Sequence, residues 1–463
     1  MKLSNREIVK LEGVVVVNEG KCYQANVVVE DGRIKTLSNS PLKGEKQSLD
    51  EVNSLPLSEG WGGSFLLPGI IDGHVHMREP GLTHKATMES ETRAAARGGV
   101  TTVLDMPNVV PQTTTLQLLQ ERYDLAEHQC HVNYGFYLGA TNDNLEEIKR
   151  LDTTFCPGVK LFMGSSTGNM LVDREEALRG IFRESPALIM AHCEDTARIN
   201  SLTQSLSKGE GIFRDLAPSL LERDGVRLHP LIRDHEACYR STELAVRLAK
   251  ETGARLHVAH ITTAQELDFF HPDDDQITAE ACVPHLLFTD DDYETLGARI
   301  KCNPAIKTKA DRDAIRKALT DGRIRTIATD HAPHLLSEKE GGLKAMSGMP
   351  MVQFSLPAVL SLVDEGVLSI ERAVELMCHN PARLYHIKER GFIREGYHAD
   401  LVLVRRKPWT VTKDCIESRC GWSPLEGRTL GWQVEKTWVN GQLVWDGQHV
   451  NTEVLGQAVT FSS

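Results

Sequence analysis

The central part of the chain alternates short apolar runs with stretches of helical periodicity, and this alternation restricts the fold more than any other feature. The eight apolar runs cover residues 67–76, 101–107, 131–139, 158–164, 187–194, 255–262, 276–288 and 325–334. Helical stretches fall between them, including 84–97, 144–151, 174–184, 236–252 and 309–321. Strands that alternate with helices in this way form parallel sheets. The pattern therefore predicts a (β/α)8 barrel, with a doubly wound open sheet as the alternative.

Both ends of the chain have a different texture, in which β-branched segments are separated by turn residues. Residues 11–37 contain an Asp31-Gly32 turn, and the segment after Pro381 contains an Asn440-Gly441 turn. Such patterns are typical of hairpins. Because chain termini often lie close together, we expect both ends to share one small β-domain. The predicted organisation assigns residues 1–66 and 388–463 to that domain and 67–387 to the barrel.

Composition narrows the class of partner. The chain has 52 Lys and Arg against 64 Asp and Glu, a net charge of −12, which disfavours nucleic acid and anionic membranes. No apolar run approaches the roughly 18 residues of a membrane span, and the start lacks a secretory signal, so we expect a cytoplasmic protein. Ten scattered cysteines without a C-x-x-C pair indicate reduced thiols. The expected partner is a small-molecule substrate, and a homo-oligomer is left open.

Histidine and carboxylate side chains follow the apolar runs, at the carboxyl ends of the strands, where barrel enzymes build their active sites. The first run ends in Asp72-Gly73-His74-Val75-His76. Side chains alternate across a strand, so His74 and His76 point to the same side. Two imidazoles at this spacing form a metal clamp, whereas a lone histidine on a strand is more often a hydrogen-bonded core residue. We therefore interpret His74 and His76 as metal ligands.

Four later runs end in further candidates: Lys160, His192, His260 and Asp330. Lys160 stands in an apolar stretch, where a free ammonium is costly. An ion pair with Asp330 would offset that cost. Carbamylation by carbon dioxide would also offset it, and burial supplies the neutral amine that this reaction needs. Unrelated core residues are the remaining interpretation, but they would have to reach one barrel rim by chance.

Nitrogen and oxygen ligands without cysteine are typical of catalytic rather than structural zinc sites. Two divalent ions that share a carbamylated Lys160 and a hydroxide would lie about 3.5 to 4 Å apart, an arrangement that produces a nucleophile at neutral pH. The predicted cofactors are two divalent ions, with Zn²⁺ the best match to the ligands. The predicted chemistry is hydrolysis or its reversal.

Two local motifs carry a family resemblance. Residues 72–81 and 328–334 resemble the two signatures of the dihydroorotases, which are cyclic-amide hydrolases of the amidohydrolase superfamily. The resemblance extends over the barrel and the flanking β-domain, and residues 158–162 match the carboxylated-lysine form of the family. It implies the reversible closure of N-carbamoyl-L-aspartate to L-dihydroorotate in pyrimidine synthesis, with Asp330 as the proton carrier. The implied metal ligands are His74, His76, a carboxylated Lys160, His192, His260 and Asp330.

Arg78 distinguishes the dihydroorotases from related cyclic-amide hydrolases. It follows the metal clamp by two residues, and a guanidinium fork there suits a substrate carboxylate, although a structural salt bridge is the alternative. Dihydroorotate carries such a carboxylate, whereas allantoin and hydantoins lack it. The resemblance adds Asn108 and His334 as further carboxylate contacts and Asn303 as a contact of the pyrimidine ring.

Two rival functions stay open. One is an allantoinase or hydantoinase, against which Arg78 argues. The other is a catalytically inactive scaffold subunit, which would be expected to have lost ligands, yet all six positions are filled. The sequence also departs from the family pattern, because Lys307 stands where an arginine is usual and a second histidine is missing beside His285. For His285, the sequence favours neither a role in the site nor a structural role.

Three other segments are assigned no chemistry. The acidic runs 273–275 and 290–292 are expected to be solvated loop or helix-start charges. Residues 164–168 are rich in Gly and Ser but lack the Gly-Lys-Ser/Thr ending of a phosphate-binding loop, so we expect a mobile barrel loop.

Overall fold

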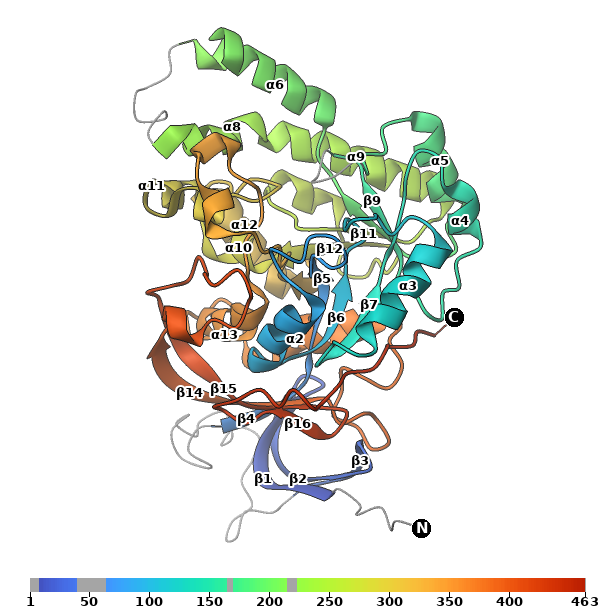
Figure 1. The fold of residues 1–463 in the computed structure, drawn as a ribbon, viewed down its shortest axis with the longest axis vertical. Coiled ribbons are helices and arrows are strands. Elements are labelled where there is room, and N and C mark those ends of the chain that lie inside the picture. The colour runs from blue at the N-terminus through green and yellow to red at the C-terminus, as the bar shows by residue number, and fades with distance from the viewer. Residues whose placement is uncertain (1–7, 40–63, 165–169, 215–222, 463) are drawn as a thin grey trace.

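A barrel of parallel strands occupies the centre of the computed structural model, which describes residues 8–39, 64–164, 170–214 and 223–462 (Figure 1). One sheet pairs β5 (Ile70–Val75), β6 (Val100–Asp105) and β7 (Asn133–Phe136). The other pairs β8 (Leu138–Gly139), β9 (Val159–Phe162), β10 (Ile189–His192), β11 (Leu256–Val258), β12 (Ile277–Cys282) and β13 (Thr326–Ala328). A parallel bridge between Val75 and His331 joins the two sheets. The predicted (β/α)8 barrel is confirmed, and the open-sheet alternative is wrong.

Three of the apolar runs differ from simple strands. The run 67–76 divides at Gly69, whose amide donates to the carbonyl of Asp400 and whose missing side chain leaves room for Thr101. The run 131–139 divides into β7 and β8. The run 276–288 is strand only as far as Cys282, because Pro284 opens the short helix α10 (Val283–Leu287), where proline fits the first turn.

Strands from both ends of the chain form a separate seven-stranded sheet, as predicted. Its order is β16 (Gln442–Trp445), β15 (Thr429–Val439), β14 (Leu401–Thr410), β4 (Ser64–Pro68), β1 (Ile8–Asn18), β2 (Lys21–Glu30) and β3 (Arg33–Asn39). The antiparallel pair of β14 and β4 connects the two halves. Figure 1 shows this sheet at the end of the barrel away from α6. The exact residue boundaries of the two domains stay predictions.

Two hairpin turns from opposite ends of the chain contact each other. Asn440 and Gly441 both have positive φ, 51° and 80°, as the tight turns favoured between antiparallel strands require. A Cβ atom on Gly441 would lie 2.6 Å from the Cα of Gly32, in the Asp31-Gly32 turn. Glycine at both positions therefore permits the close approach that unites the two halves of the β-domain.

Helices occupy the predicted intervals. They are α2 (Met88–Arg97), α4 (Leu145–Lys149), α5 (Glu175–Glu184), α9 (His235–Thr252) and α12 (Lys309–Asp321). Further helices are α3 (Leu116–Ala126), α6 (Thr196–Lys208), α8 (His229–Ile232), α11 (Tyr293–Leu296), α13 (Ser355–Asp364), α14 (Ile370–Val374) and α15 (Asn380–Leu384). Local sequence sets their ends: Asp234 caps the start of α9, and Gly253 ends it in the left-handed conformation.

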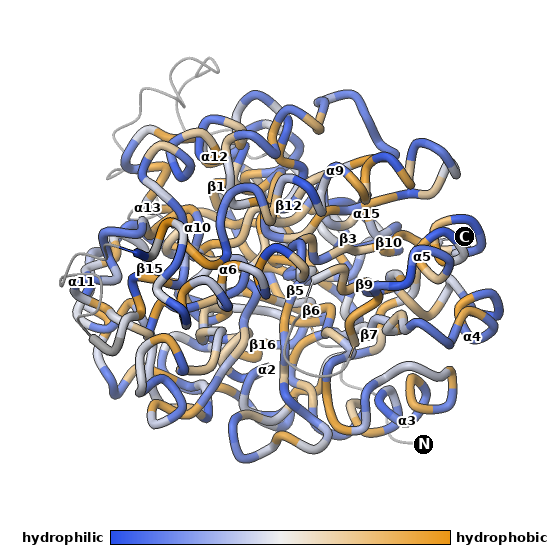
Figure 2. The backbone as a smooth tube through the Cα atoms, turned by 90° about the horizontal axis from the view of Figure 1, so that it is seen from above, coloured by the Kyte–Doolittle hydropathy of each residue, from blue (hydrophilic) through white to orange (hydrophobic). Residues whose placement is uncertain are grey.

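The remaining sequence expectations have mixed outcomes. All ten cysteines are free thiols, as predicted. Asp290–Asp292 form a 3-10 turn after Thr289, which confirms a helix-start role for that acidic run. Residues 165–168 of the predicted barrel loop lie outside the described residues. Seen from above, the outer loops are largely hydrophilic (Figure 2), and no helix within the described ranges is long and apolar enough to cross a membrane.

Candidate metal and substrate site

The carboxyl ends of the barrel strands bring the predicted site residues together. His74 lies on β5, Lys160 on β9 and His192 on β10, while His76, His260 and Asp330 directly follow or closely follow a strand. One cavity is lined by these six residues and by Arg78, Asn108 and Asn303. His334, the tenth predicted residue, is not among the lining residues but contacts Arg78. The sequence pattern therefore located the site, although the role of each residue stays a proposal.

His74 and His76 turn the same ring nitrogen toward Asp330. Their Nε2 atoms lie 3.4 and 3.0 Å from Oδ1 of Asp330. On the opposite side of each ring, Nδ1 of His74 lies 2.8 Å from Oε1 of Glu280, and Nδ1 of His76 lies 2.7 Å from Oδ1 of Asn108. Each Nδ1–H can therefore donate to an oxygen while Nε2 keeps its lone pair, which is the tautomer that binds a metal.

His192, at the end of β10, and His260, just after β11, form a second pair. Nδ1 of His192 lies 2.9 Å from Nε2 of His260, and Nε2 of His192 lies 2.9 Å from Oε2 of Glu194. Glu194 also pairs with Arg233. Burial holds the pKa of His260 well below the usual imidazole value, as it does for His74. The rings of His260 and His74 are therefore neutral, the form that ligates metals.

Lys160 is fully buried, and among the described residues its Nζ has no hydrogen-bond partner. The structure describes no ion pair within 4 Å between Lys160 and Asp330, so that alternative is wrong. Instead Nζ lies 5.1 Å from the centre of the Phe162 ring. Burial is the main influence on this amine and lowers its pKa. Burial thus favours the neutral amine that carbamylation requires, and Lys160 lines the cavity.

The donor set fits a metal ion. His74, His260 and Asp330 each offer one ligand atom, and these atoms lie within 4.8 Å of one another. Nδ1 of His260 and Nζ of Lys160 are buried without a described partner, which is expected where a ligand completes the site. Burial alone would raise the pKa of Asp330, but the imidazoles of His74 and His76 outweigh it and hold that pKa well below its usual range.

Strained backbone accompanies the cluster. Arg78, His260 and Asp330 have φ values of 67°, 36° and 48°, in a region that non-glycine residues seldom adopt. Such conformations cost on the order of 1 to 3 kcal/mol each and concentrate at functional sites. The fold therefore holds these three side chains in place at some expense in stability.

Arg78 and His334 form a basic group at the edge of the cavity. Arg78 is buried, its Nε donates to the carbonyl of Pro333, and its terminal nitrogen lies 3.0 Å from Nε2 of His334. Burial lowers the pKa of Arg78 to about 10, which still leaves it charged at neutral pH. Lys85, which the sequence analysis missed, places its Nζ 3.0 Å from Nδ1 of His334 and pairs with Glu338.

The other side chains divide between the site and the core. Asn303 lines the cavity, and its Oδ1 is buried without a described partner. His285 contacts the carbonyl of Pro304 at 3.1 Å, which gives it a structural role. Glu194 and Glu280 were also missed, although a signal was present: Glu280 is a carboxylate within a buried strand, and Glu194 is one two residues after a buried strand.

A larger hollow of about 870 Å³ lies elsewhere, lined in part by Tyr123, Tyr134 and Phe155. None of the His, Cys, Asp and Glu groups able to hold a metal among the described residues lies in it. The strand-end cavity is therefore the better candidate for catalysis.

Comparison with known proteins agrees with this geometry. The sequence model of the Amidohydrolase family matches residues 65–444, which is most of the chain. The chain belongs to the amidohydrolase family.

Curated relatives cover nearly the whole chain. It is 33% identical to a dihydroorotase of Halobacterium salinarum over 92% of its own length and 97% of the relative's. It is 30% identical to an allantoinase of Streptomyces avermitilis over 87% and 89%. Among solved structures, an L-hydantoinase of Arthrobacter aurescens superimposes with a TM-score of 0.86 at 27% identity, covering 98% and 99% of the two chains. This amidohydrolase is therefore a hydrolase of the cyclic-amide class.

Proposed function

We propose that this amidohydrolase is a metal-dependent dihydroorotase, which reversibly closes N-carbamoyl-L-aspartate to L-dihydroorotate in pyrimidine synthesis. The observation that carries the proposal is the buried guanidinium of Arg78, which lines the same cavity as the histidine and aspartate cluster. A buried cation at the cavity wall suits a substrate anion, and dihydroorotate carries a carboxylate that allantoin and hydantoin lack. Similarity to the dihydroorotase of Halobacterium salinarum supports the same choice.

We assign the metal site, which would hold two divalent ions, to His74, His76, carbamylated Lys160, His192, His260 and Asp330. Carbamylation joins the lysine nitrogen to the carbon of CO₂, and the amine gives up a proton. When bound, Zn²⁺ or a similar ion polarises the ring carbonyl and lowers the pKa of water. The neutral imidazoles and the partnerless Lys160 amine support this assignment.

Asp330 is assigned the proton transfer. In ring opening, its carboxylate accepts a proton from the attacking water while the water oxygen bonds to the ring carbonyl carbon. The carbon–nitrogen bond then breaks, and Asp330 returns the proton to the departing ring nitrogen. Ring closure follows the reverse path. Its position supports this role, because Asp330 lines the same cavity as Arg78 and its Oδ1 lies 3.0 Å from Nε2 of His76.

The basic edge of the cavity is assigned to substrate binding. Arg78, with His334 and Asn108, holds the α-carboxylate, and Asn303 faces the polar edge of the ring. Holding the carboxylate in this way orients the ring carbonyl toward the attacking water. Asn108 has a second role in this proposal, because its Oδ1 also accepts from His76.

An allantoinase or hydantoinase is the second candidate. It is favoured by the allantoinase of Streptomyces avermitilis at 30% identity and by the close superposition on the L-hydantoinase. An inactive scaffold subunit is disfavoured, because all six proposed ligands line one cavity.

Turnover of three substrates tests the proposal directly. The purified chain, reconstituted with Zn²⁺ and bicarbonate, would be assayed on dihydroorotate, allantoin and hydantoin, with metal content measured on the same sample. We expect kcat/KM for dihydroorotate to exceed the other two by at least an order of magnitude. If allantoin or hydantoin is turned over faster, the protein is an allantoinase or a hydantoinase and the dihydroorotase proposal is wrong. If a fully metallated sample turns over none of the three substrates, the inactive scaffold subunit is favoured.

A further inference from the structure

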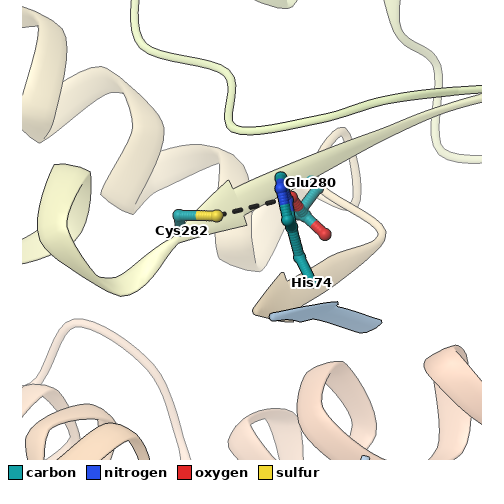
Figure 3. Close-up of side chains that lie close together, drawn as sticks. All are labelled: His74, Glu280 and Cys282. Carbon is teal, nitrogen blue, oxygen red and sulfur yellow. Dashed lines mark hydrogen bonds and ion pairs between the residues drawn. The ribbon is translucent and has the colours of Figure 1, made fainter. Parts of the chain in front are cut away.

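Glu280 is a buried carboxylate that the proposed mechanism does not use. It lies on β12, between β11 and β13, the strands that His260 and Asp330 follow, and its side chain points at His74 (Figure 3). Three donors meet its Oε1: Nδ1 of His74 at 2.8 Å, the backbone amide of His260 at 3.2 Å and the thiol of Cys282 at 3.3 Å. One oxygen thus connects two of the proposed ligands through hydrogen bonds.

The contact with His260 matters because the backbone there is strained. His260 has a φ of 36°, and its amide donates to the side chain of Glu280 while the next amide, of Ile261, donates to the Glu280 carbonyl at 2.8 Å. Glu280 therefore holds the end of β11 at two points. Without that support, the chain at His260 could relax toward an ordinary conformation and withdraw the imidazole.

The contact with His74 fixes the ring. A carboxylate that accepts from Nδ1–H leaves Nε2 unprotonated and prevents the ring from flipping. A buried carboxylate is costly unless it is hydrogen-bonded or paired, so its presence in the fully buried strand β12 calls for a role.

We propose that Glu280 is a positioning residue that fixes the His74 imidazole and the backbone at His260, so that both rings face a metal ion. The inference rests on the metal site proposed above and not on the identity of the substrate. The alternative is that His74, Glu280 and Cys282 themselves bind an ion, since their ligand atoms also lie within 4.8 Å of one another.

Zinc affinity of a graded series of variants tests the proposal. Dissociation constants for Zn²⁺ would be measured by chelator competition for the wild type, Glu280→Gln and Glu280→Ala, together with absorption spectra of the Co²⁺-loaded proteins. We expect Glu280→Ala to weaken Zn²⁺ binding about 10- to 100-fold and to change the Co²⁺ spectrum. Glu280→Gln should lie between it and the wild type, because an amide oxygen can still accept from His74 and His260.

Glu266→Ala is the matched control. Glu266 is also a buried carboxylate, but it accepts from Thr242 and Thr263 and contacts none of the proposed ligands. Its removal should leave Zn²⁺ affinity within about twofold of the wild type. If Glu280→Ala does not fold, the comparison of Glu280→Gln with Glu266→Gln makes the same test.

The outcomes separate the possible failures. If the wild type binds no divalent ion, the proposed metal site fails. If it binds Zn²⁺ and Glu280→Ala binds equally well, the positioning role is wrong. If Cys282→Ala and Glu280→Ala each lose one equivalent of Zn²⁺, the three residues are themselves ligands, which also overturns the inference.

Discussion

Nζ of Lys85 lies 3.0 Å from Nδ1 of His334, so a donor-only side chain fixes the tautomer of an imidazole at the edge of the cavity. Burial, with Arg78 and Lys85 nearby, holds the pKa of His334 well below its usual value, and the ring is neutral. Because Nδ1 accepts from Lys85, Nε2 carries the hydrogen and can donate to the carbonyl of Ser347 at 3.0 Å. The Arg78 nitrogen, also 3.0 Å from Nε2, then faces a ring nitrogen that cannot accept from it, so its hydrogen stays available to a substrate anion.

Lys85→Met should therefore weaken the binding of the carboxylated substrate. Without Lys85, Nε2 of His334 is free to accept from Arg78, and both groups are less available to the substrate. A hydrogen bond to a charged group contributes about 1.5 to 3 kcal/mol, so we expect KM for dihydroorotate to rise by about tenfold or more while kcat changes little. Glu338→Gln removes the other partner of Lys85 and should leave KM nearly unchanged. Equal KM values for wild type and Lys85→Met would contradict this account.

Arg78→Ala should abolish discrimination between charged and uncharged cyclic amides. Removal of one partner of a desolvated charge pair costs about 2 to 5 kcal/mol, and only the carboxylated substrate makes that pair. The measurement compares dihydroorotate with dihydrouracil, for wild type and variant at the same zinc content. Arg78→Lys should restore part of the loss, since an ammonium lacks the planar two-bond match. Equal losses on both substrates would show that Arg78 shapes the cavity and does not bind the carboxylate.

The site residues could be predicted where metal-ligating side chains fall at strand positions fixed by side-chain alternation. His74 and His76 are two residues apart on a strand, and His192 ends an apolar run, so their positions follow from side-chain alternation and from the barrel rim. The barrel followed from the same apolar runs. The split at Gly69 did not, because it depends on contacts with Thr101 and Asp400, which are distant in sequence.

Residues that act through other residues were harder to find. Lys85 precedes α2 in a polar segment, and nothing in its sequence neighbourhood indicates that it contacts His334, 249 positions later. Glu280 stands alone among apolar neighbours, which signals a buried charge but not its partners. Spacing along the chain gives no distance between strand ends, so the sequence could not exclude the ion pair with Asp330 that was one alternative for Lys160.

Lys160→Ala should lose at least one equivalent of zinc and nearly all turnover. The variant removes the amine that we propose to be carbamylated, and with it the carboxylate that the two ions share. Short carboxylic acids such as acetate or propionate should restore part of the activity, because they can occupy the gap. Metal content and activity, measured with and without the acid, check the prediction. A mass measurement that finds Lys160 unmodified in fully active protein would falsify the carbamylation.

Asp330→Asn should separate proton transfer from metal binding. The amide has nearly the shape of the carboxylate, and its oxygen can occupy the same position, so we expect the fold and some zinc to be retained. It cannot act as a base, however, and general acid–base catalysis typically contributes about 10²- to 10⁴-fold. We therefore expect kcat to fall by at least about 10²-fold in both directions of the reaction. KM for dihydroorotate should change little, because Arg78 and His334 are untouched. Parallel losses of zinc and activity would mean that Asp330 acts mainly as a ligand, and wild-type turnover at neutral pH would require the proton to travel through another residue.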